Sequence, residues 1–313
     1  MRSFFLFASP RFRLPGRFLR SLTLLGVILA ASALPVRTAR GDALQTPAAP
    51  TRPEGQSASP LVVIDPGHGG EKPGTVAADG TPEKQLALDI ALKLERLLAE
   101  RHVQVRLTRS EDEHIDLKDR IALANDLNAA AFMSIHLNAM PTRTARLRTR
   151  GVETYFLAKR ATGERAQAVA NAENAEDAQA AEPQDDLAFI LADLAEAEAH
   201  RDASQFAYTV HEQMALRLPT RDRGVHQAPF LVLKGAQMPA ILVEVGYLSH
   251  PKESLLLEDG AYQDKIAQAL SLGIAEFLEK RGLLAPLPKA PKAPAKQPPR
   301  KPVQAKPKAA GKR

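Results

Sequence analysis

From Leu61 to Lys280, short apolar stretches alternate with longer segments whose apolar residues recur at helical spacing. The stretch LVVID (61–65) is a continuous apolar run, which is typical of a strand buried on both faces. The segment 83–100 that follows carries apolar residues every three or four positions, with charges between them, as in an amphipathic helix. Strands that alternate with helices predict a single layered α/β domain, with a mostly parallel, twisted sheet flanked by helices.

The same patterns predict the individual elements of this domain, which we expect to span residues 60–282. Strands are expected at 61–65, 103–109, 130–139, 151–157, 230–235 (FLVLKG) and 239–249. Helices are expected at 83–100, 116–129 and 264–280, and throughout the alanine-rich segment 160–218.

The N-terminus has the composition of an export signal. Five arginines in the first 20 residues precede LTLLGVILAASALP (22–35), an apolar run that is long enough for a signal peptide and short for a membrane span. We therefore expect a signal peptide over 1–40, with a small-residue cleavage site at Ala31-Ser32-Ala33. The alternative is an uncleaved membrane anchor. Either way the rest of the chain is expected outside the cytoplasm, in the periplasm, or secreted or wall-associated if the host lacks an outer membrane.

Two further segments differ in composition from the domain. Residues 41–59 are small, polar and proline-rich, and are expected to form a linker. Residues 283–313, rich in Lys, Pro and Ala, are expected to be a disordered basic tail. Residues 41–288 hold 26 Lys and Arg against 36 Asp and Glu, a net charge of −10. The positive charge thus lies at the two ends, which argues against a nucleic-acid-binding surface.

Four polar side chains mark a candidate metal centre. The chain has no cysteine, so a metal site must use His, Asp or Glu. His68 and His136 lie at the ends of predicted strands, where sites form in open α/β sheets. Glu83 begins a predicted helix, and Glu244 interrupts the apolar strand 239–249. Two histidines and a glutamate are the ligand set of many catalytic zinc sites, which leave the fourth position to water.

Each of these residues also has a structural explanation. An isolated histidine at a strand end is more often a hydrogen-bonded core or surface residue, and Glu83 could simply favour the dipole of its helix. Glu244 is harder to explain in this way, because an unpaired carboxylate in an apolar strand costs several kcal/mol.

Taken together, several segments resemble one family, the zinc-dependent N-acetylmuramoyl-L-alanine amidases of bacterial cell walls, in the cell-separation group. The matching segments occur in the family's order over roughly residues 60–281: VVIDPGHGG (62–70), Glu83, LTR (107–109), LKDRIALAND (117–126), SIHLNA (134–139) and PAILVEVGYLSHPKE (239–253). The resemblance implies a phosphorylase/hydrolase-like fold, one Zn²⁺ bound by His68, Glu83 and His136, and Glu244 as the catalytic carboxylate. Asn138 and Arg120 match family positions too, although a packing role explains each equally well.

The implied reaction is hydrolysis of the amide between N-acetylmuramic acid and L-alanine of the peptidoglycan stem peptide. Zinc would acidify its bound water and polarise the carbonyl, while Glu244 would take the proton and return it to the leaving amine. A carboxylate in an apolar strand is expected to have a raised pKa, which suits this exchange. Two alternatives are an inactive wall-binding protein with the same fold and another exported zinc hydrolase, such as a deacetylase of sugar amides.

The acidic part of the helical segment is the remaining informative feature. Between Ala166 and His200 there are nine acidic residues and no Lys or Arg. In the cell-separation amidases a helical insertion covers the zinc site until an activator, such as a LytM-domain protein, removes it. Here the insertion would span about 160–205, and a carboxylate such as Glu173 could occupy the open zinc position. A solvated acidic helix face explains the charge equally well. The basic tail would contact anionic wall polymers or membrane surfaces, or serve as an inert extension.

Overall fold

The computed structural model describes residues 59–175 and 193–286, which belong to one compact unit, Gly55–Arg313. The predicted signal peptide, nearly all of the linker, the acidic residues 176–192 and the tail from 287 lie outside the described residues. Within the described ranges, every helix is too short or too polar to cross a bilayer. The expected domain and both ends of its helical insertion can therefore be compared with the sequence, whereas the export signal and the tail cannot.

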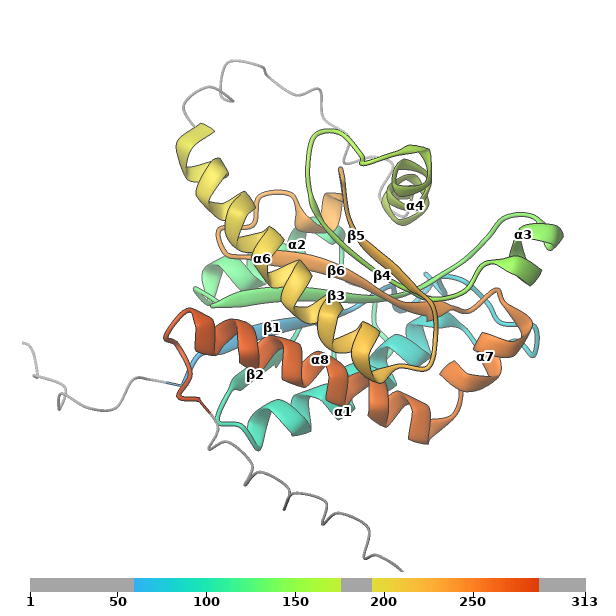
Figure 1. Cartoon of the computed structure of the whole chain (residues 1–313), viewed down its shortest axis with the longest axis horizontal. Coiled ribbons are helices and arrows are strands. Elements are labelled where there is room, and N and C mark those ends of the chain that lie inside the picture. The colour runs from blue at the N-terminus through green and yellow to red at the C-terminus, as the bar shows by residue number, and fades with distance from the viewer. Residues whose placement is uncertain (1–58, 176–192, 287–313) are drawn as a thin grey trace, which may run out of the picture. The chain divides into compact units, whose positions relative to one another are not determined.

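A six-stranded sheet in the order β2-β1-β3-β6-β4-β5 forms the centre of the domain (Figure 1). The strands are β1 (Leu61–Pro66), β2 (Gln104–Leu107), β3 (Ala131–Asn138), β4 (Val152–Leu157), β5 (Asp222–Ala228) and β6 (Ala240–Tyr247). Strands β2, β1, β3 and β6 are parallel, so their carboxyl ends meet at one edge. Strand β4 runs antiparallel to β6, and β5 runs parallel to β4. The mostly parallel sheet is confirmed, with its last two strands reversed.

Helices cover both faces of the sheet (Figure 1). One face packs against α1 (Glu83–Ala99), α6 (Asp193–Arg217) and α8 (Gly260–Lys280). The other packs against α2 (Leu117–Asp126), α4 (Glu164–Asn174) and the 3₁₀ turn η2 (Leu231–Leu233). Two short helices, α3 (Arg143–Arg148) and α7 (Pro251–Leu257), lie in the connections β3–β4 and β6–α8.

The alternation of side chains along the strands decides where polar groups can gather, because successive residues point to opposite faces. In β6, Ile241 and Val243 belong to the larger core beneath α1, α6 and α8, whereas Leu242 belongs to the core beneath α2 and α4. By the same alternation Glu244 shares a face with Leu242. The second core is the smaller one, and polar side chains take up the rest of that face towards the carboxyl edge.

Two expectations for the elements need correction. The stretch FLVLKG is not a strand but contains η2, whose Val232 and Leu233 pack into the second core. The strand lies earlier, at β5 (DRGVHQA), which is an edge strand with mostly half-exposed, polar residues. An edge strand can be polar because one side of it faces solvent, so an apolar run was the wrong signal for it.

Candidate metal centre

The turn after β1 brings His68 to the carboxyl edge of the sheet. His68 has a left-handed backbone with φ of 60°, an uncommon conformation for a residue other than glycine. Gly67 lies against the imidazole of His136, since a Cβ on Gly67 would stand 2.4 Å from Cε1 of that ring. Gly74 is equally confined, because a Cβ added at this residue would lie 2.6 Å from Cδ2 of His68. The glycines flanking this turn therefore allow two imidazoles to approach each other.

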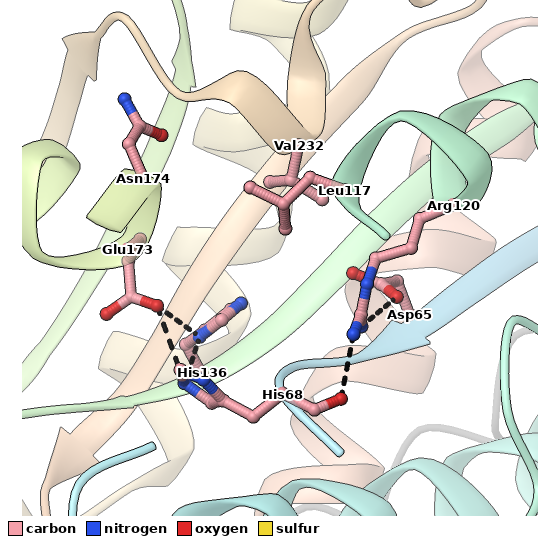
Figure 2. Close-up of a pocket in the computed structure, with 8 residues that line it drawn as sticks. All are labelled: Asp65, His68, Leu117, Arg120, His136, Glu173, Asn174 and Val232. Carbon is pink, nitrogen blue, oxygen red and sulfur yellow. Dashed lines mark hydrogen bonds and ion pairs between the residues drawn. The ribbon is translucent and has the colours of Figure 1, made fainter. Parts of the chain in front are cut away.

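A buried ion pair holds the turn in place (Figure 2). Arg120, on α2, donates from Nη1 to Oδ1 of Asp65 at 2.8 Å and from Nη2 to the carbonyl of His68 at 2.8 Å. Asp65 also accepts hydrogen bonds from Thr108 and Ser134, each at 2.6 Å. Burial alone would raise the pKa of Asp65, but the Arg120 guanidinium and the hydrogen bonds outweigh it and lower the pKa.

Three of the predicted ligands meet at one point. Nε2 of His68 lies 3.0 Å from Oε1 of Glu83, and Nδ1 of His136 lies 3.2 Å from the same oxygen. The two ring nitrogens are 3.2 Å apart. Glu173, from α4, approaches from the other side, with Oε2 at 2.9 Å from Nδ1 of His136 and 3.4 Å from Nε2 of His68 (Figure 2). These four side chains offer ligand atoms that all lie within 4.8 Å of one another.

Glu83 is fixed by the backbone rather than by its helix. It is buried, and its Oε1 accepts a hydrogen bond from the backbone N–H of Leu137 at 2.8 Å. Its Oε2 accepts one from the N–H of Thr75 at 2.8 Å. Burial by itself raises the pKa of Glu83, but the neighbouring His68 and His136 lower it well below its usual value. The carboxylate thus stays ionised and points into the cluster, which a role at the helix start alone would not require.

Glu244 lies directly beside this cluster. It pairs in register with His136 across the parallel strands β3 and β6, so both side chains lie on the same face of the sheet. Glu244 is fully buried, and neither of its carboxylate oxygens has a hydrogen-bond partner among the described residues. Burial, and then the negative charge of Glu173, raise the pKa of Glu244 well above its usual value. Its carboxylate therefore binds a proton more readily than an ordinary glutamate does, and it accepts no hydrogen bond from any other described group.

A second buried carboxylate, Glu153 on β4, faces Glu244 across the antiparallel pair and was missed by the sequence analysis. Unlike Glu244 it is fully satisfied. Its hydrogen-bond donors are Asn138, Tyr155 and Tyr247 at 2.9 Å each and Arg223 at 2.7 Å, and Arg165 adds an ion pair at 3.0 Å. The same signal that marked Glu244, an acidic residue within an apolar strand, is present in GVETYFL and could have found it.

The donor set fits a divalent cation. Ligand atoms bound to a tetrahedral ion at about 2.0–2.1 Å stand about 3.3 Å apart. The five measured separations among the His68, Glu83, His136 and Glu173 atoms fall between 2.9 and 3.4 Å. Two imidazoles and two carboxylates without thiolates suit zinc and similar ions. Without a cation, the buried carboxylate of Glu83 and the half-buried carboxylate of Glu173 would approach the same two imidazoles at an electrostatic cost.

The fold and this cluster define a class: an α/β protein with a buried His/Glu metal-ligating centre, beside a free carboxylate, at the carboxyl edge of its parallel strands. Comparison with known proteins narrows the class, since residues 62–276 match the family described as N-acetylmuramoyl-L-alanine amidase. The chain belongs to this family of hydrolases, which degrade the peptidoglycan of the cell wall.

Individual relatives agree with this assignment. N-acetylmuramoyl-L-alanine amidase AmiA of Escherichia coli K12 is 29% identical over 256 residues, which cover 80% of this chain and 87% of the relative. AmiC of Neisseria meningitidis serogroup B is 33% identical over 71% of this chain and 55% of its own length. Among solved structures, the catalytic domain of CwlV, an N-acetylmuramoyl-L-alanine amidase of Bacillus (Paenibacillus) polymyxa, is 31% identical in sequence with a TM-score of 0.54, and the match covers 70% of this chain and 98% of that domain. AmiC2 of Nostoc punctiforme is 28% identical with a TM-score of 0.55, and the match covers 72% of this chain and 99% of the AmiC2 chain.

Proposed function

We propose that this protein hydrolyses the amide bond between N-acetylmuramic acid and L-alanine of peptidoglycan, with His68, Glu83 and His136 holding one Zn²⁺ and Glu244 moving the proton. The observation that carries the assignment of roles is the contrast between the two kinds of carboxylate at the site. Glu83 is locked by two backbone N–H groups and kept ionised, as a ligand must be. Glu244 has no hydrogen-bond partner among the described residues and a raised pKa, as a proton carrier needs.

A zinc ion bound there would supply a Lewis acid that activates water and polarises the amide carbonyl. The chain's own residues do the rest. Glu244 accepts the proton of the attacking water at a carboxylate oxygen and donates it to the amide nitrogen as the bond breaks. Arg120 and Asp65 hold the His68 turn, so that the imidazole keeps its position during the reaction. Glu244 is fully buried, and no described group donates a hydrogen bond that would compete for its oxygens.

The activity can be tested with purified sacculi and mass spectrometry of the products. We expect the protein, with zinc, to release peptides that begin at L-alanine, and chelation or Glu244→Gln to reduce release by about two orders of magnitude or more. Loss of acetate instead of peptide release would identify a deacetylase. The same assay is run on zinc-loaded protein whose α4 contacts have been removed. If this protein binds sacculi but releases neither peptide nor acetate, it is an inactive wall-binding protein, and the proposal is contradicted.

We further propose that Glu173 makes α4 a gate over the metal centre. Its carboxylate lies in ion-pair contact with both imidazoles, at the position that a substrate or water would need. Other contacts hold the helix down: Ala166, Val169 and Ala170 are buried beneath it, and Asn174 donates to the carbonyl of Pro229 at 2.8 Å. These contacts support an autoinhibited state that an activator, such as a LytM-domain protein, would relieve by lifting α4.

We also propose that the protein acts after export, in the periplasm, and takes part in wall remodelling and the separation of daughter cells. The arginine-led apolar run at 22–35 and a substrate outside the cytoplasm support this site of action. The basic tail would add attraction to anionic wall or membrane surfaces. Fractionation of cells that carry a tagged chain tests the location, and an enlarged cytoplasmic pool with no processed form would contradict it.

A further inference from the structure

A second hollow lies outside the metal centre, between α3 and the start of α7. It has a volume of about 310 Å³ and is lined by Leu147, Arg148, Arg150, His250, Pro251 and Lys252. Two connections build it, one from β3 to β4 and one from β6 to α7. A hydrogen bond from the backbone N–H of Met140 to Oγ of Ser249, at 2.9 Å, ties these two connections together. Figure 1 shows α3 projecting from the body of the domain at this end.

The hollow is on the same edge of the sheet as the metal centre. Strand β3 carries His136 and β6 carries Glu244, and each of the two connections leaves the carboxyl end of one of these strands. In an open sheet of parallel strands this edge is where ligands bind. A long ligand that lies along this edge can therefore contact both the hollow and the residues of the metal centre.

The positive charges around the hollow form no ion pair with the part of the chain that the structure describes. Arg148, Arg150 and Lys252 are exposed, and none forms an ion pair with a carboxylate in residues 59–175 or 193–286. The adjacent acidic residue, Glu253, is buried; burial raises its pKa, and the nearby charges of His250 and Arg150 offset part of that rise. Its oxygens accept hydrogen bonds from the backbone N–H groups of Gly151 and Tyr247. Three cations thus line one space, and Arg148 and Lys252 have neither an ion pair nor an electrostatic effect on Glu253 among the described residues, an arrangement that suits an anionic ligand.

The shape and chemistry of the hollow favour a carboxylate on a peptide. Two of its three cations are arginines, whose planar guanidinium groups match carboxylates in a two-pronged geometry. Leu147, with 58% of its surface exposed, and Pro251 add an apolar wall suited to the carbon chain of an amino acid. A space of this size accommodates one or two residues, whereas an anionic polymer or membrane surface would be matched by a broad, flat basic patch.

We propose that this hollow, which we call the basic hollow, binds a free carboxylate of the stem peptide whose amide bond is being cleaved. This inference rests on the proposed function, because it assigns to that reaction a subsite that orients the peptide side of the substrate. The basic hollow would anchor the peptide while the sugar side and the scissile bond lie at the metal centre.

The test compares two ligands and two variants in the full-length chain. One ligand is a synthetic muramyl peptide with free carboxylates, and the other is the same peptide with its carboxylates amidated. The test variant is Arg148→Gln/Lys252→Gln. The control is Arg143→Gln/Lys234→Gln, which removes two exposed charges that do not line the hollow. Dissociation constants are measured by calorimetry in a Glu244→Gln background, so that no turnover is needed.

We expect the test variant to bind the free-carboxylate peptide about tenfold more weakly, which corresponds to the loss of one or two charge-assisted contacts. Its affinity for the amidated peptide should be unchanged, and the control variant should match the parent with both ligands.

Equal affinities for both peptides in the parent, or an equal loss with both in the test variant, would overturn the proposal. So would a test variant that keeps its peptide affinity but no longer binds vesicles containing anionic lipid, since the hollow would then serve a membrane. A wild-type protein that binds both peptides as expected but releases no product would instead contradict the proposed function alone.

Discussion

At the scale of single residues, the proposed ligands His68 and Glu83 are each held by a group that takes no part in the proposed reaction. Arg120 binds the carbonyl of His68, and the N–H of Leu137 orients Glu83. That His68, Glu83 and His136 lie together could be predicted, because the histidines stand out at the ends of apolar strands and the resemblance adds Glu83 at a helix start. Their supports could not, because Arg120 and Asp65 are 55 positions apart and nothing local in the sequence indicates that they pair.

Asp65 makes a testable contribution to stability. Its folded pKa is lowered by Arg120, so its stabilising effect is present above the unfolded pKa of about 4 and is lost as the pH falls through the lower folded pKa. We expect Asp65→Asn to lower the free energy of unfolding at neutral pH by about 3–5 kcal/mol, because Arg120 keeps a buried charge without its partner. In strong acid the difference from wild type should shrink.

Urea unfolding at a series of pH values measures this effect. The control is Asp126→Asn, on the exposed side of α2, which should stay within about 0.5 kcal/mol of wild type throughout. If Asp65→Asn loses the same stability at every pH, the lowered pKa of Asp65 is not the cause.

At the scale of elements, α4 is the helix that we propose as a gate over the candidate metal centre. Its fixed side comprises apolar residues packed on the second core, and its last turn presents Glu173 to the two imidazoles. The sequence predicted a helix here, and Glu173 as the carboxylate that approaches the metal centre. It could not show that Arg165, two turns earlier on the same helix, pairs with Glu153 of β4, because that contact depends on how the helix lies across the sheet.

We expect Arg165→Gln/Glu173→Gln to raise basal wall hydrolysis about five- to thirtyfold, because the three ion pairs lost together favour the closed position of α4 by about 1–2 kcal/mol. Dye release from labelled sacculi, in the absence of any activator, measures the rate. The matched control is Arg160→Gln/Glu164→Gln, which makes the same charge changes at exposed positions just before and at the start of α4. A folded test variant with the wild-type basal rate would mean that α4 does not gate the site.

At the scale of the whole molecule, much of the architecture followed from the sequence. The strands β1, β3 and β6 and the helices α1 and α8 were predicted because they are buried and strongly periodic. The reversal of β4 and β5 and the polar edge strand β5 were not, because strand direction is set by connections rather than by side-chain pattern. A short apolar run such as FLVLKG fits a strand and a packed turn equally well.

Metal binding should stabilise the whole domain, because the proposed ligands come from separate parts of the chain: His68 follows β1, Glu83 begins α1 and His136 lies in β3. We expect zinc at about 100 times its dissociation constant to add about 2.7 kcal/mol, or several degrees in the melting temperature. Differential scanning calorimetry with and without chelator measures the shift. His136→Ala should abolish it, and a wild-type melting temperature that does not respond to zinc would contradict a metal centre at this position.

The two arginines on Glu153 have one consequence for such a gate. Arg165 belongs to α4, but Arg223 comes from β5 and, with both tyrosines and Asn138, would stay behind if α4 lifted. Glu153 would thus keep a positive counter-charge in the open state. Opening would then break only the contacts that α4 itself makes. In the proposed gate, this redundancy would let α4 open without leaving a buried, unpaired carboxylate in the sheet beneath.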